Sequence, residues 1–540
     1  MPHVSYALPG AAASFLLCHA VVLAQAALPP LLAPIAQPPA AAVAWDAAER
    51  ARNPMLVQTT FVQVDTAALR ALPPGGAPPL GSFRLDLFAQ PVAIDITSTS
   101  WTLGYRVFRG NVPGQGSDLV LTLAPTGELS AAIDVGDLQF AIAPAGAPGV
   151  HVLQRIDAGQ MTSSMGCGTD ASHGVNAPVP VGSSLVATAN SDCSLTTFDV
   201  LICYTPQARI DAGGTAAMEA TLVGAIEQAN SAHRDSGAPV EFRLVHMAET
   251  NYTEVGTGTD LSRFRNTSDG FMDEVHALRN DYGADLMHLV IAQSSAFCGI
   301  GYLMGNVSTG FNTSAFGVTV RTCIPNRTLT HEIGHNMGCH HDAPNAGGTP
   351  AFPYSYGYRT PNDQYRTIMA YAPGTRVNLW SSPNVVYQGF TMGVAGSADN
   401  ALSITNVAAT VAQFRSTQAP QWCQLGGGIA AAAGKPTLIG SGTINQVAPL
   451  QLHAANYGPL GVGLLILGAA PINVPLFGGT LVPSIDFTET LVGSGAPIAH
   501  DASWLATQAP GFQAWCQVAF LDLAAPQGWS ASDAVRVTRP

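Results

Sequence analysis

Charged side chains are scarce in this sequence, and lysine is almost absent. Asp, Glu, Lys and Arg together make up 11% of the 540 residues, and Lys435 is the single lysine among 22 basic residues. The formal net charge is −13. Proteins that bind nucleic acid carry a basic patch or stripe that neutralises phosphates. This sequence has no such stripe, so we do not expect nucleic acid as a partner.

Long apolar runs are missing as well. A transmembrane helix needs about 20 consecutive apolar residues, and the best candidate, residues 458–477, is broken by Gly and Pro. We therefore expect no stable membrane insertion. Residues 11–23 form a shorter apolar core, and Ala24-Gln25-Ala26 after it has the small-x-small pattern of a cleavage site. This arrangement predicts a signal peptide over residues 1–26 and a secreted, extracellular protein.

Cysteine is uncommon, and its number fits an extracellular protein. The chain has nine cysteines, and removal of the one in the signal peptide leaves an even number for disulfides. Cys298 and Cys323 flank an expected edge strand, so we predict a disulfide between them. Cys423 and Cys516 are the only cysteines near the C-terminus, and we predict that they form a second disulfide.

The most specific pattern is HEIGHNMGCHHD at residues 331–342. His331 and His335 are four residues apart, and this spacing puts both imidazoles on one face of a helix. Zinc suits such ligands, and in catalytic sites it keeps a position open for water. Glu332 follows the first ligand directly, where it can take a proton from the water that zinc activates.

The residues after this helix predict a third ligand. Gly338 has no Cβ, so the chain can leave the helix in a left-handed conformation and turn sharply. That turn would bring His341 back to the metal. His340 is the alternative, but only His341 has the required spacing from His335. A bare HExxH arises by chance or as a structural histidine cluster, whereas the extended motif favours a metalloprotease with Zn²⁺ as its cofactor.

A second motif, TIMAY, places Met369 and Tyr371 downstream of the histidines. HExxHxxGxxH followed by such a Met resembles the metzincin clan of zinc endopeptidases. The His341-Asp342 pair is similar to the adamalysin (reprolysin) branch, and residues 197–416 resemble bacterial reprolysin-like enzymes, including the peptidyl-Asp metalloendopeptidases. The resemblance implies that Met369 lies beneath the zinc as a hydrophobic floor. The alternative is an ordinary core methionine.

The chain is too long for one hydrophobic core, so a multidomain protein is expected. Strands and helices alternate between residues 197 and 416, which predicts an α/β metzincin-like catalytic domain with a mixed twisted sheet and an active-site helix. The expected strands cover residues 199–204, 240–247, 286–292 and, at the edge, 298–303. The expected helices cover residues 216–235, 271–281, 328–337 and 401–414.

Two β-rich regions flank this domain. Short alternating runs separated by turn signals predict a β-rich domain over residues 27–165. Its position before a protease favours a pro-domain, and an accessory β-domain is the alternative. Residues 166–196 are expected to be a linker that contains the processing region. Gly-punctuated strands predict a β-sandwich-like domain over residues 423–540.

Cys167 is a candidate for control of activity. The sequence Met165-Gly166-Cys167-Gly168 loosely resembles the cysteine-switch segment of metzincin pro-domains, in which a thiolate occupies the open position of zinc. Thiolates are good zinc ligands. A Cys167–Cys193 disulfide is the alternative.

The motifs predict a zinc-dependent endopeptidase that hydrolyses internal bonds of proteins or peptides, with Glu332 as the general base. Tyr371 could donate a hydrogen bond to the oxyanion, since M-x-Y recurs in the astacin and serralysin branches, or could simply pack on the cleft wall. The competing hypotheses are an inactive secreted binding or adhesion protein and a zinc hydrolase with another substrate. Cleavage beside Asp, as in the relatives, needs a cationic pocket. Its candidates flank the motif and are Arg321, Arg327, Arg359, Arg366 and Arg376. The alternative for each of them is a surface residue that forms an ion pair.

Overall fold

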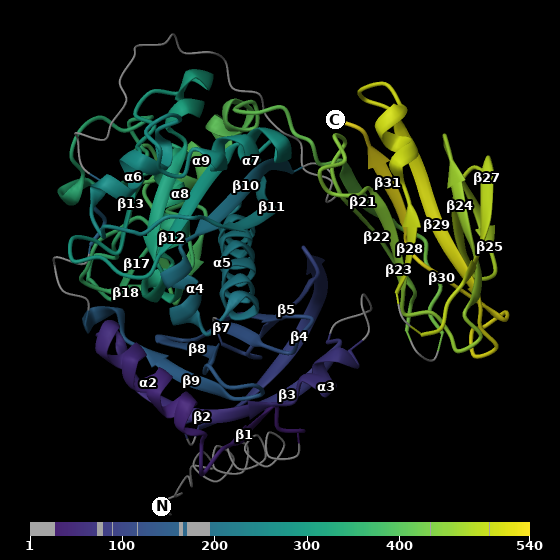
Figure 1. The fold of residues 1–540 in the computed structure, drawn as a ribbon, viewed down its shortest axis with the longest axis horizontal. Coiled ribbons are helices and arrows are strands. Elements are labelled where there is room, and N and C mark those ends of the chain that lie inside the picture. Colours follow the sequence, from purple (N-terminus) through teal and green to yellow (C-terminus); the bar gives the residue numbers. More distant parts are fainter. Residues whose placement is uncertain are drawn as a thin grey trace, which may run out of the picture.

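The computed structural model describes residues 28–72, 79–88, 90–115, 117–160, 166–169, 195–431, 434–495 and 497–540. Three regions rich in β-structure follow one another along the chain (Figure 1). The predicted signal peptide lies outside the described residues, as does most of the linker predicted for residues 166–196. Among the described residues, no helix is both long and apolar enough to cross a membrane.

The first region is one curved sheet of nine antiparallel strands, in the order β1-β2-β9-β8-β7-β6-β5-β4-β3. Alternation explains its core, because in β3 (Gly81–Leu87) every second side chain from Phe83 to Leu87 is buried. The helices α2 (Ala40–Arg52) and α3 (Thr66–Arg70) accompany this sheet. The other strands are β1 (Leu32–Pro34), β2 (Leu56–Val64), β4 (Gln90–Thr102), β5 (Tyr105–Asn111), β6 (Ser117–Leu123), β7 (Leu129–Val135), β8 (Leu138–Pro144) and β9 (His151–Ile156).

The second region has a five-stranded mixed sheet in the order β11-β10-β12-β14-β13. All its neighbouring strands are parallel except β13, which is antiparallel to β14 at the edge. The predicted mixed α/β sheet is thereby confirmed. The strands are β10 (Thr196–Tyr204), β11 (Val240–Glu249), β12 (Leu286–Ile291), β13 (Gly299–Gly301) and β14 (Phe316–Val320).

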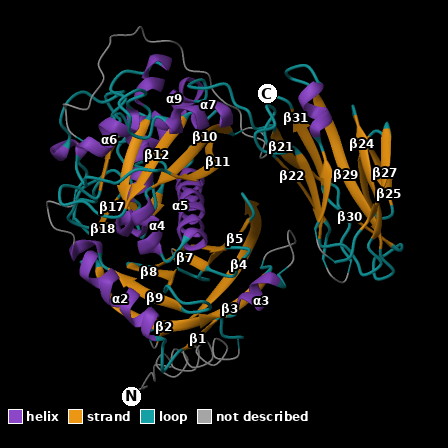
Figure 2. Ribbon diagram, in the orientation of Figure 1, coloured by secondary structure: helices purple, strands orange, loops and turns teal. Residues whose placement is uncertain are grey.

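Four helices of this region lie within a few residues of their expected ranges: α5 (Thr215–Ser236), α7 (Glu274–Tyr282), α8 (Thr328–Asn336) and α9 (Asn400–Val411). The sequence pattern did not predict α4 (Pro206–Ala212) and α6 (Gly258–Arg265). Most of α5 is buried, because it packs against β11 on one side and against β6 and β7 of the first sheet on the other (Figure 2). Short strand pairs join β15 (His340–Asp342) to β16 (Tyr356–Gly357), β17 (Tyr365–Arg366) to β18 (Thr375–Arg376), and β19 (Val386–Tyr387) to β20 (Phe390–Thr391).

Ion pairs fasten the first sheet to the second region. Glu49 of α2 pairs with Arg321, and Asp134 of β7 pairs with Arg327, the residue before helix α8. The amide of Asn378 donates a 2.8 Å hydrogen bond to Asp118 of β6. These contacts join charged groups of the first region to the segment that leads into helix α8.

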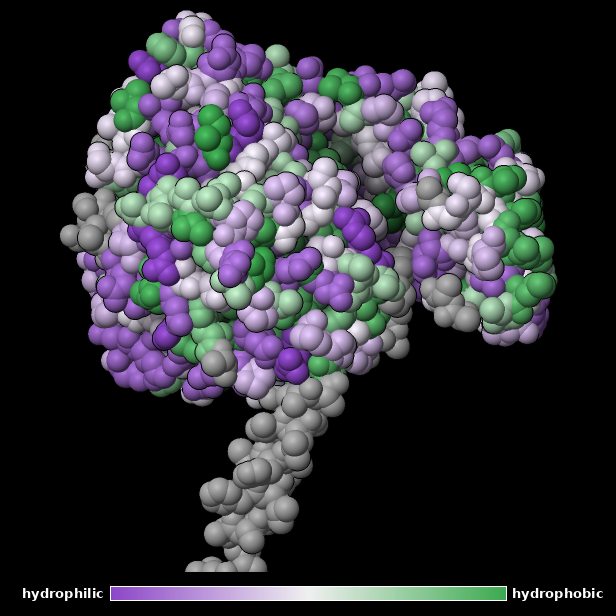
Figure 3. All heavy atoms as spheres, turned by 60° about the horizontal axis from the view of Figure 1, so that its bottom comes forward, coloured by the Kyte–Doolittle hydropathy of each residue, from purple (hydrophilic) through white to green (hydrophobic). Residues whose placement is uncertain are grey.

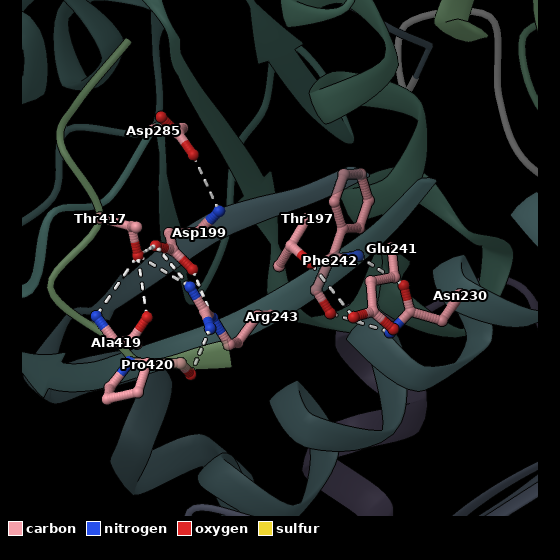
Figure 4. A network of polar contacts seen from close by, with 10 residues as sticks. All are labelled: Thr197, Asp199, Asn230, Glu241, Phe242, Arg243, Asp285, Thr417, Ala419 and Pro420. Atoms are coloured by element: carbon pink, nitrogen blue, oxygen red, sulfur yellow. Dashed lines mark hydrogen bonds and ion pairs between the residues drawn. The ribbon is translucent and has the colours of Figure 1, made fainter. Parts of the chain in front are cut away.

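The link after α9 is also held by a polar network (Figure 4). The guanidinium of Arg243, on β11, pairs with Asp199 on β10 at 2.7 Å and donates to the carbonyl of Pro420 at 3.0 Å. Thr417 donates to Asp199 and accepts from Arg243. These contacts hold residues 417–420 against β10 and β11, where the chain leaves the α/β region.

The third region consists of antiparallel strands arranged in several sheets, the largest in the order β21-β31-β29-β24-β27. Figure 3 shows hydrophobic residues at the outer edge of this region. Its strands are β21 (Gln421–Gly426), β22 (Thr437–Ser441), β23 (Gln451–Ala455), β24 (Val462–Gly468), β25 (Pro471–Leu476), β26 (Gly479–Pro483), β27 (Phe487–Val492), β28 (Ile498–Asp501), β29 (Gln513–Leu521), β30 (Trp529–Ala531) and β31 (Ala534–Thr538).

One expected disulfide forms and the other does not. Cys298 and Cys323 are bonded, with a Cα–Cα separation of 5.7 Å. Cys516 is a free, buried thiol, so the prediction of a Cys423–Cys516 disulfide is wrong. Cys423 lies on β21 and Cys516 on β29, and β31 runs between these two strands. Two strand spacings amount to roughly 9–10 Å, whereas a disulfide needs Cα atoms within roughly 7 Å.

Candidate active site

Helix α8 presents His331 and His335 to a common point, and the following turn adds His341. One ligand atom from each of these histidines and the sulfur of Cys167 all lie within 4.8 Å of one another. The Nε2 atoms of His335 and His341 are 3.1 Å apart. Three nitrogens that each lie about 2 Å from one ion must converge in this way. The geometry therefore fits a zinc ion held by three histidines.

Backbone carbonyls fix the orientation of two of the rings. Nδ1 of His331 lies 2.9 Å from the carbonyl oxygen of Ile368, and Nδ1 of His335 lies 2.8 Å from that of Cys339. A carbonyl only accepts, so Nδ1 carries the proton and Nε2 keeps its lone pair for a metal. Nε2 of His331 is buried without a hydrogen-bond partner among the described residues, as expected of an atom that binds a metal.

Burial also keeps the three rings in the neutral form. It lowers the pKa of His331 and of His335 well below the usual value, and the neighbouring histidines add to this effect. Burial lowers the pKa of His341 to about 3. Neutral imidazole is the form that binds metals. The burial of these rings therefore keeps them in the form that a metal ligand requires.

The turn after α8 selects His341 over His340. Gly338 has φ +78°, which an L side chain rarely adopts, and a Cβ there would lie 2.6 Å from Ala351 Cβ. The ring of His340 turns away, with Nε2 2.6 Å from the carbonyl oxygen of Gly347. His341 alone joins the cluster.

Met369 lies beneath the histidines. It is fully buried, and its sulfur packs so closely on α8 that a Cβ at Gly334 would be 2.8 Å away. Gly334 lies between His331 and His335 in sequence, so the thioether touches the helix next to both ligands. The preceding carbonyl, of Ile368, is the acceptor for His331.

Glu332 is buried beside the cluster. Its pKa is raised to about 8 by burial, and the guanidinium of Arg376 and a hydrogen bond from Cys167 partly offset this rise. Its Oε2 accepts a hydrogen bond from the thiol of Cys167 at 3.3 Å. The carboxylate thus faces the space into which the histidines also point.

Two glycines of β13, which sequence reasoning missed, create room for Glu332. A Cβ on Gly299 would lie 2.5 Å from Glu332 Oε1, and a Cβ on Gly301 would lie 2.9 Å from the Glu332 carbonyl oxygen. The only local signal was the Gly-Ile-Gly sequence within an expected edge strand. By itself, this sequence indicates an interruption of the strand.

Cys167 reaches the site from the segment before the α/β region. Its sulfur lies 3.4 Å from Nε2 of His335, and it is a free cysteine, so the alternative disulfide with Cys193 does not form. The segment 166–169 runs parallel to β13. Gly168 N donates to the carbonyl of Gly299 at 2.8 Å, and Cys298 N donates to that of Gly166 at 2.9 Å.

Tyr371 lies beside the histidines. Its ring centroid is 4.3 Å from that of His341, and its hydroxyl donates to the carbonyl of Cys167 at 3.1 Å. Its backbone N–H donates to Asp342 at 2.9 Å. The hydroxyl is therefore near the metal ligands, and its partner belongs to the segment 166–169.

The five candidate arginines fall in different places. Arg321 and Arg327 pair with carboxylates of the first sheet, and Arg359 pairs with Asp342. Arg366 donates to the backbone carbonyls of Gly374 and Ala370. Arg376 donates to the carbonyls of Asn326 and Ala370, and its charge interacts with Glu332, Tyr371 and Cys167.

Comparison with known proteins agrees with this site. The sequence model of metallo-peptidase family M12 matches residues 194–381. A peptidyl-Asp metalloendopeptidase of Xanthomonas campestris pv. campestris is 31% identical over 381 residues, which cover 67% of this chain and 87% of the relative. One from Stenotrophomonas maltophilia (strain R551-3) is 34% identical over 276 residues, which cover 49% of this chain and 63% of the relative.

Structural likeness is weaker. The crystal structure of metalloproteinase-II from Bacteroides fragilis aligns over 64% of this chain and 95% of its own, with a TM-score of 0.38 and 13% identity. A TM-score of this size does not define the fold.

The site and the sequence relationships together define a zinc metallopeptidase. The chain belongs to metallo-peptidase family M12 and is similar to the bacterial peptidyl-Asp metalloendopeptidases.

Proposed function

We propose that the protein is a secreted zinc endopeptidase in which Glu332 is the general base. One observation carries this proposal: the sulfur of Cys167 contacts both Glu332 Oε2, at 3.3 Å, and His335 Nε2, at 3.4 Å. A single small group can thus touch the metal ligands and the carboxylate together, and a water molecule at that place would do the same.

The chemistry follows from these positions. Bound zinc supplies Lewis acidity, which activates water and polarises the scissile carbonyl. Glu332 accepts the proton of the attacking water and delivers it to the leaving amine.

Tyr371 is proposed to stabilise the oxyanion. Its hydroxyl donates a hydrogen bond to the carbonyl of Cys167 at 3.1 Å. Departure of Cys167 would leave the hydroxyl free to donate to a carbonyl oxygen of the substrate. A donor of this kind acts mainly on charge that develops in the transition state.

The edge strand β13 is proposed to bind the substrate. Its backbone groups now pair with the segment 166–169, as in the bond from Gly168 N to Gly299 O. An extended peptide would take that place and pair antiparallel through its own backbone, which suits internal segments of a protein. The segment 166–169 runs parallel to β13. Its chain direction is therefore opposite to that of the proposed antiparallel substrate.

This arrangement supports the idea that residues 27–165 are a pro-domain. Glu49 of α2 and Asp134 of β7 form ion pairs with Arg321 and Arg327, and Cys167 occupies the space beside Glu332. Thiolate is a strong zinc ligand, so Cys167 would keep the full chain inactive until residues 166–196 are cut. The catalytic domain would then comprise residues 197–416, and residues 423–540 would form a β-sandwich-like accessory domain.

Cleavage beside Asp, the activity that the names of the relatives describe, is proposed for this chain as well. The test of the whole proposal is hydrolysis of casein by protein recovered after processing. We expect internal cleavage that a zinc chelator abolishes and added zinc restores. A folded, zinc-containing protein that hydrolyses neither casein nor peptides would instead support a binding or adhesion role.

A further inference from the structure

We infer that Arg376 determines specificity by binding the acidic side chain next to the cleaved bond. This inference rests on the proposed endopeptidase function. It selects one residue from five arginines that flank the zinc motif and that sequence alone could not distinguish.

The charge of Arg376 is not paired with a carboxylate among the described residues. The residue is buried, with 4% exposure. Nη1 donates to the carbonyl of Asn326 at 2.9 Å and Nη2 to that of Ala370 at 3.4 Å, whereas Nε is buried and has no partner among the described residues. Within the described part of the chain it forms no ion pair. A buried cation that forms no ion pair is costly, so a carboxylate that bound to its guanidinium would be stabilised there.

The position of Arg376 also favours this role. Asn326 lies just before helix α8, and Ala370 lies between Met369 and Tyr371. The guanidinium therefore bridges the start of the active-site helix and the turn beneath the metal ligands. Arg376 thus contacts both the segment that leads into the helix of His331 and His335 and the residue next to Tyr371.

The other arginines are less suitable. Arg321 and Arg359 already have carboxylate partners, and Arg366 donates to backbone carbonyls further along the same loop. Arg327 would lose its partner Asp134 if the first sheet were removed. Its Nη1 donates to the backbone carbonyl of Arg376 at 3.1 Å. Arg327→Gln therefore removes a neighbouring positive charge but leaves the two guanidinium hydrogen bonds of Arg376 in place, and it serves as the control.

Guanidinium groups recognise carboxylates through paired, charge-assisted hydrogen bonds. Aspartate could form them with Nε and one Nη of Arg376. Asparagine has the same shape, but its amide has one oxygen and no charge, so the guanidinium would remain largely unsatisfied. Discrimination between Asp and Asn peptides of otherwise identical sequence therefore reports on this contact.

The experiment compares kcat/KM for such a peptide pair, with Asp placed on either side of the cleaved bond. Full-length protein is produced, allowed to process and assayed as wild type, Arg376→Gln and Arg327→Gln. We expect wild type to prefer Asp and Arg376→Gln to reduce that preference on the order of 10- to 100-fold, the range of a hydrogen bond to a charged group. Asn peptide hydrolysis should change little, and Arg327→Gln should keep the wild-type preference.

A second variant covers the case in which Arg376→Gln does not fold. Arg376→Lys keeps the charge and a donor for the backbone carbonyls, but its side chain is shorter. The preference should then shift from Asp towards the longer Glu, which a purely structural role would not cause.

The outcomes are separable. Wild type that hydrolyses no peptide contradicts the proposed function itself. Hydrolysis without preference for Asp, an unchanged preference in the Arg376 variants, or loss of preference in Arg327→Gln overturns only the inference about Arg376.

Discussion

The sulfur of Cys167 lies 3.4 Å from Nε2 of His335, although 168 positions separate the two residues in sequence. The same sulfur donates to Glu332. A residue from the segment before the α/β region therefore lies where His335 and Glu332 meet.

Cys167→Ser should activate the uncleaved chain. Serine is a poorer zinc ligand than thiolate, so water and substrate would compete successfully for the site. We expect casein hydrolysis by the full-length variant at a level that wild type reaches only after processing. Cys516→Ser changes another buried free cysteine and should leave the uncleaved chain inactive. Equal inactivity of both variants would contradict the latency mechanism.

Glu332→Gln should lower the rate by roughly 10² to 10⁴, the range typical of general base catalysis. The amide preserves the shape of the side chain but cannot accept and return the proton. Zinc content should stay at the wild-type level, because Glu332 is not among the converging ligand atoms. Near-normal hydrolysis of peptides by this variant would refute the assigned role.

Tyr371→Phe distinguishes a catalytic hydroxyl from a packing role. Loss of one oxyanion donor costs about 2.7–4 kcal/mol, or 10² to 10³ in kcat, with little change in KM. The ring would still stack beside His341, so zinc affinity should be unchanged. A fully active Phe variant would leave Tyr371 as part of the cleft wall.

The interface between the first sheet and the α/β region should weaken as the pH rises. Burial, together with Asp134 and Asp235, raises the pKa of Asp118 to about 7, and Arg327 and Asn378 oppose the rise. The folded chain therefore binds a proton at Asp118 that the unfolded chain releases near pH 4. This stabilisation is fully present below pH 4 and is lost as the pH rises to about 7.

The size of this effect is at most about 4 kcal/mol, and less because Asp118 retains some exposure to solvent. Asp118→Asn mimics the protonated form, so wild type should lose stability relative to the variant between pH 4 and 7. Free energies of unfolding of the two full-length chains, measured across that range, provide the test. A difference that does not depend on pH would show that Asp118 titrates normally.

The sequence predicted the parts of the site that depend on local spacing. His331 and His335 share a helix face because of the helical period, and Gly338 turns the chain because of its left-handed conformation. The helix expected over residues 216–235 is α5, at Thr215–Ser236, because its apolar residues follow the same period.

Features that depend on long-range packing could not be predicted. The failed pairing of Cys423 with Cys516 arises because β31 runs between their strands, and strand order is not a local property. Arg376 is 35 residues beyond His341, and only the folded turn brings its charge to Glu332. The need for Gly299 became visible only from its contact with that carboxylate.

Zinc content of single-histidine variants tests the central claim most directly. Purified full-length wild type, His341→Ala and His340→Ala are compared by elemental analysis, with circular dichroism to show that each is folded. The account predicts one zinc ion per chain in wild type and in His340→Ala, because His340 instead contacts the carbonyl of Gly347. It predicts a large loss of zinc in His341→Ala. Retention of zinc in His341→Ala together with its loss in His340→Ala would contradict the proposed metal centre.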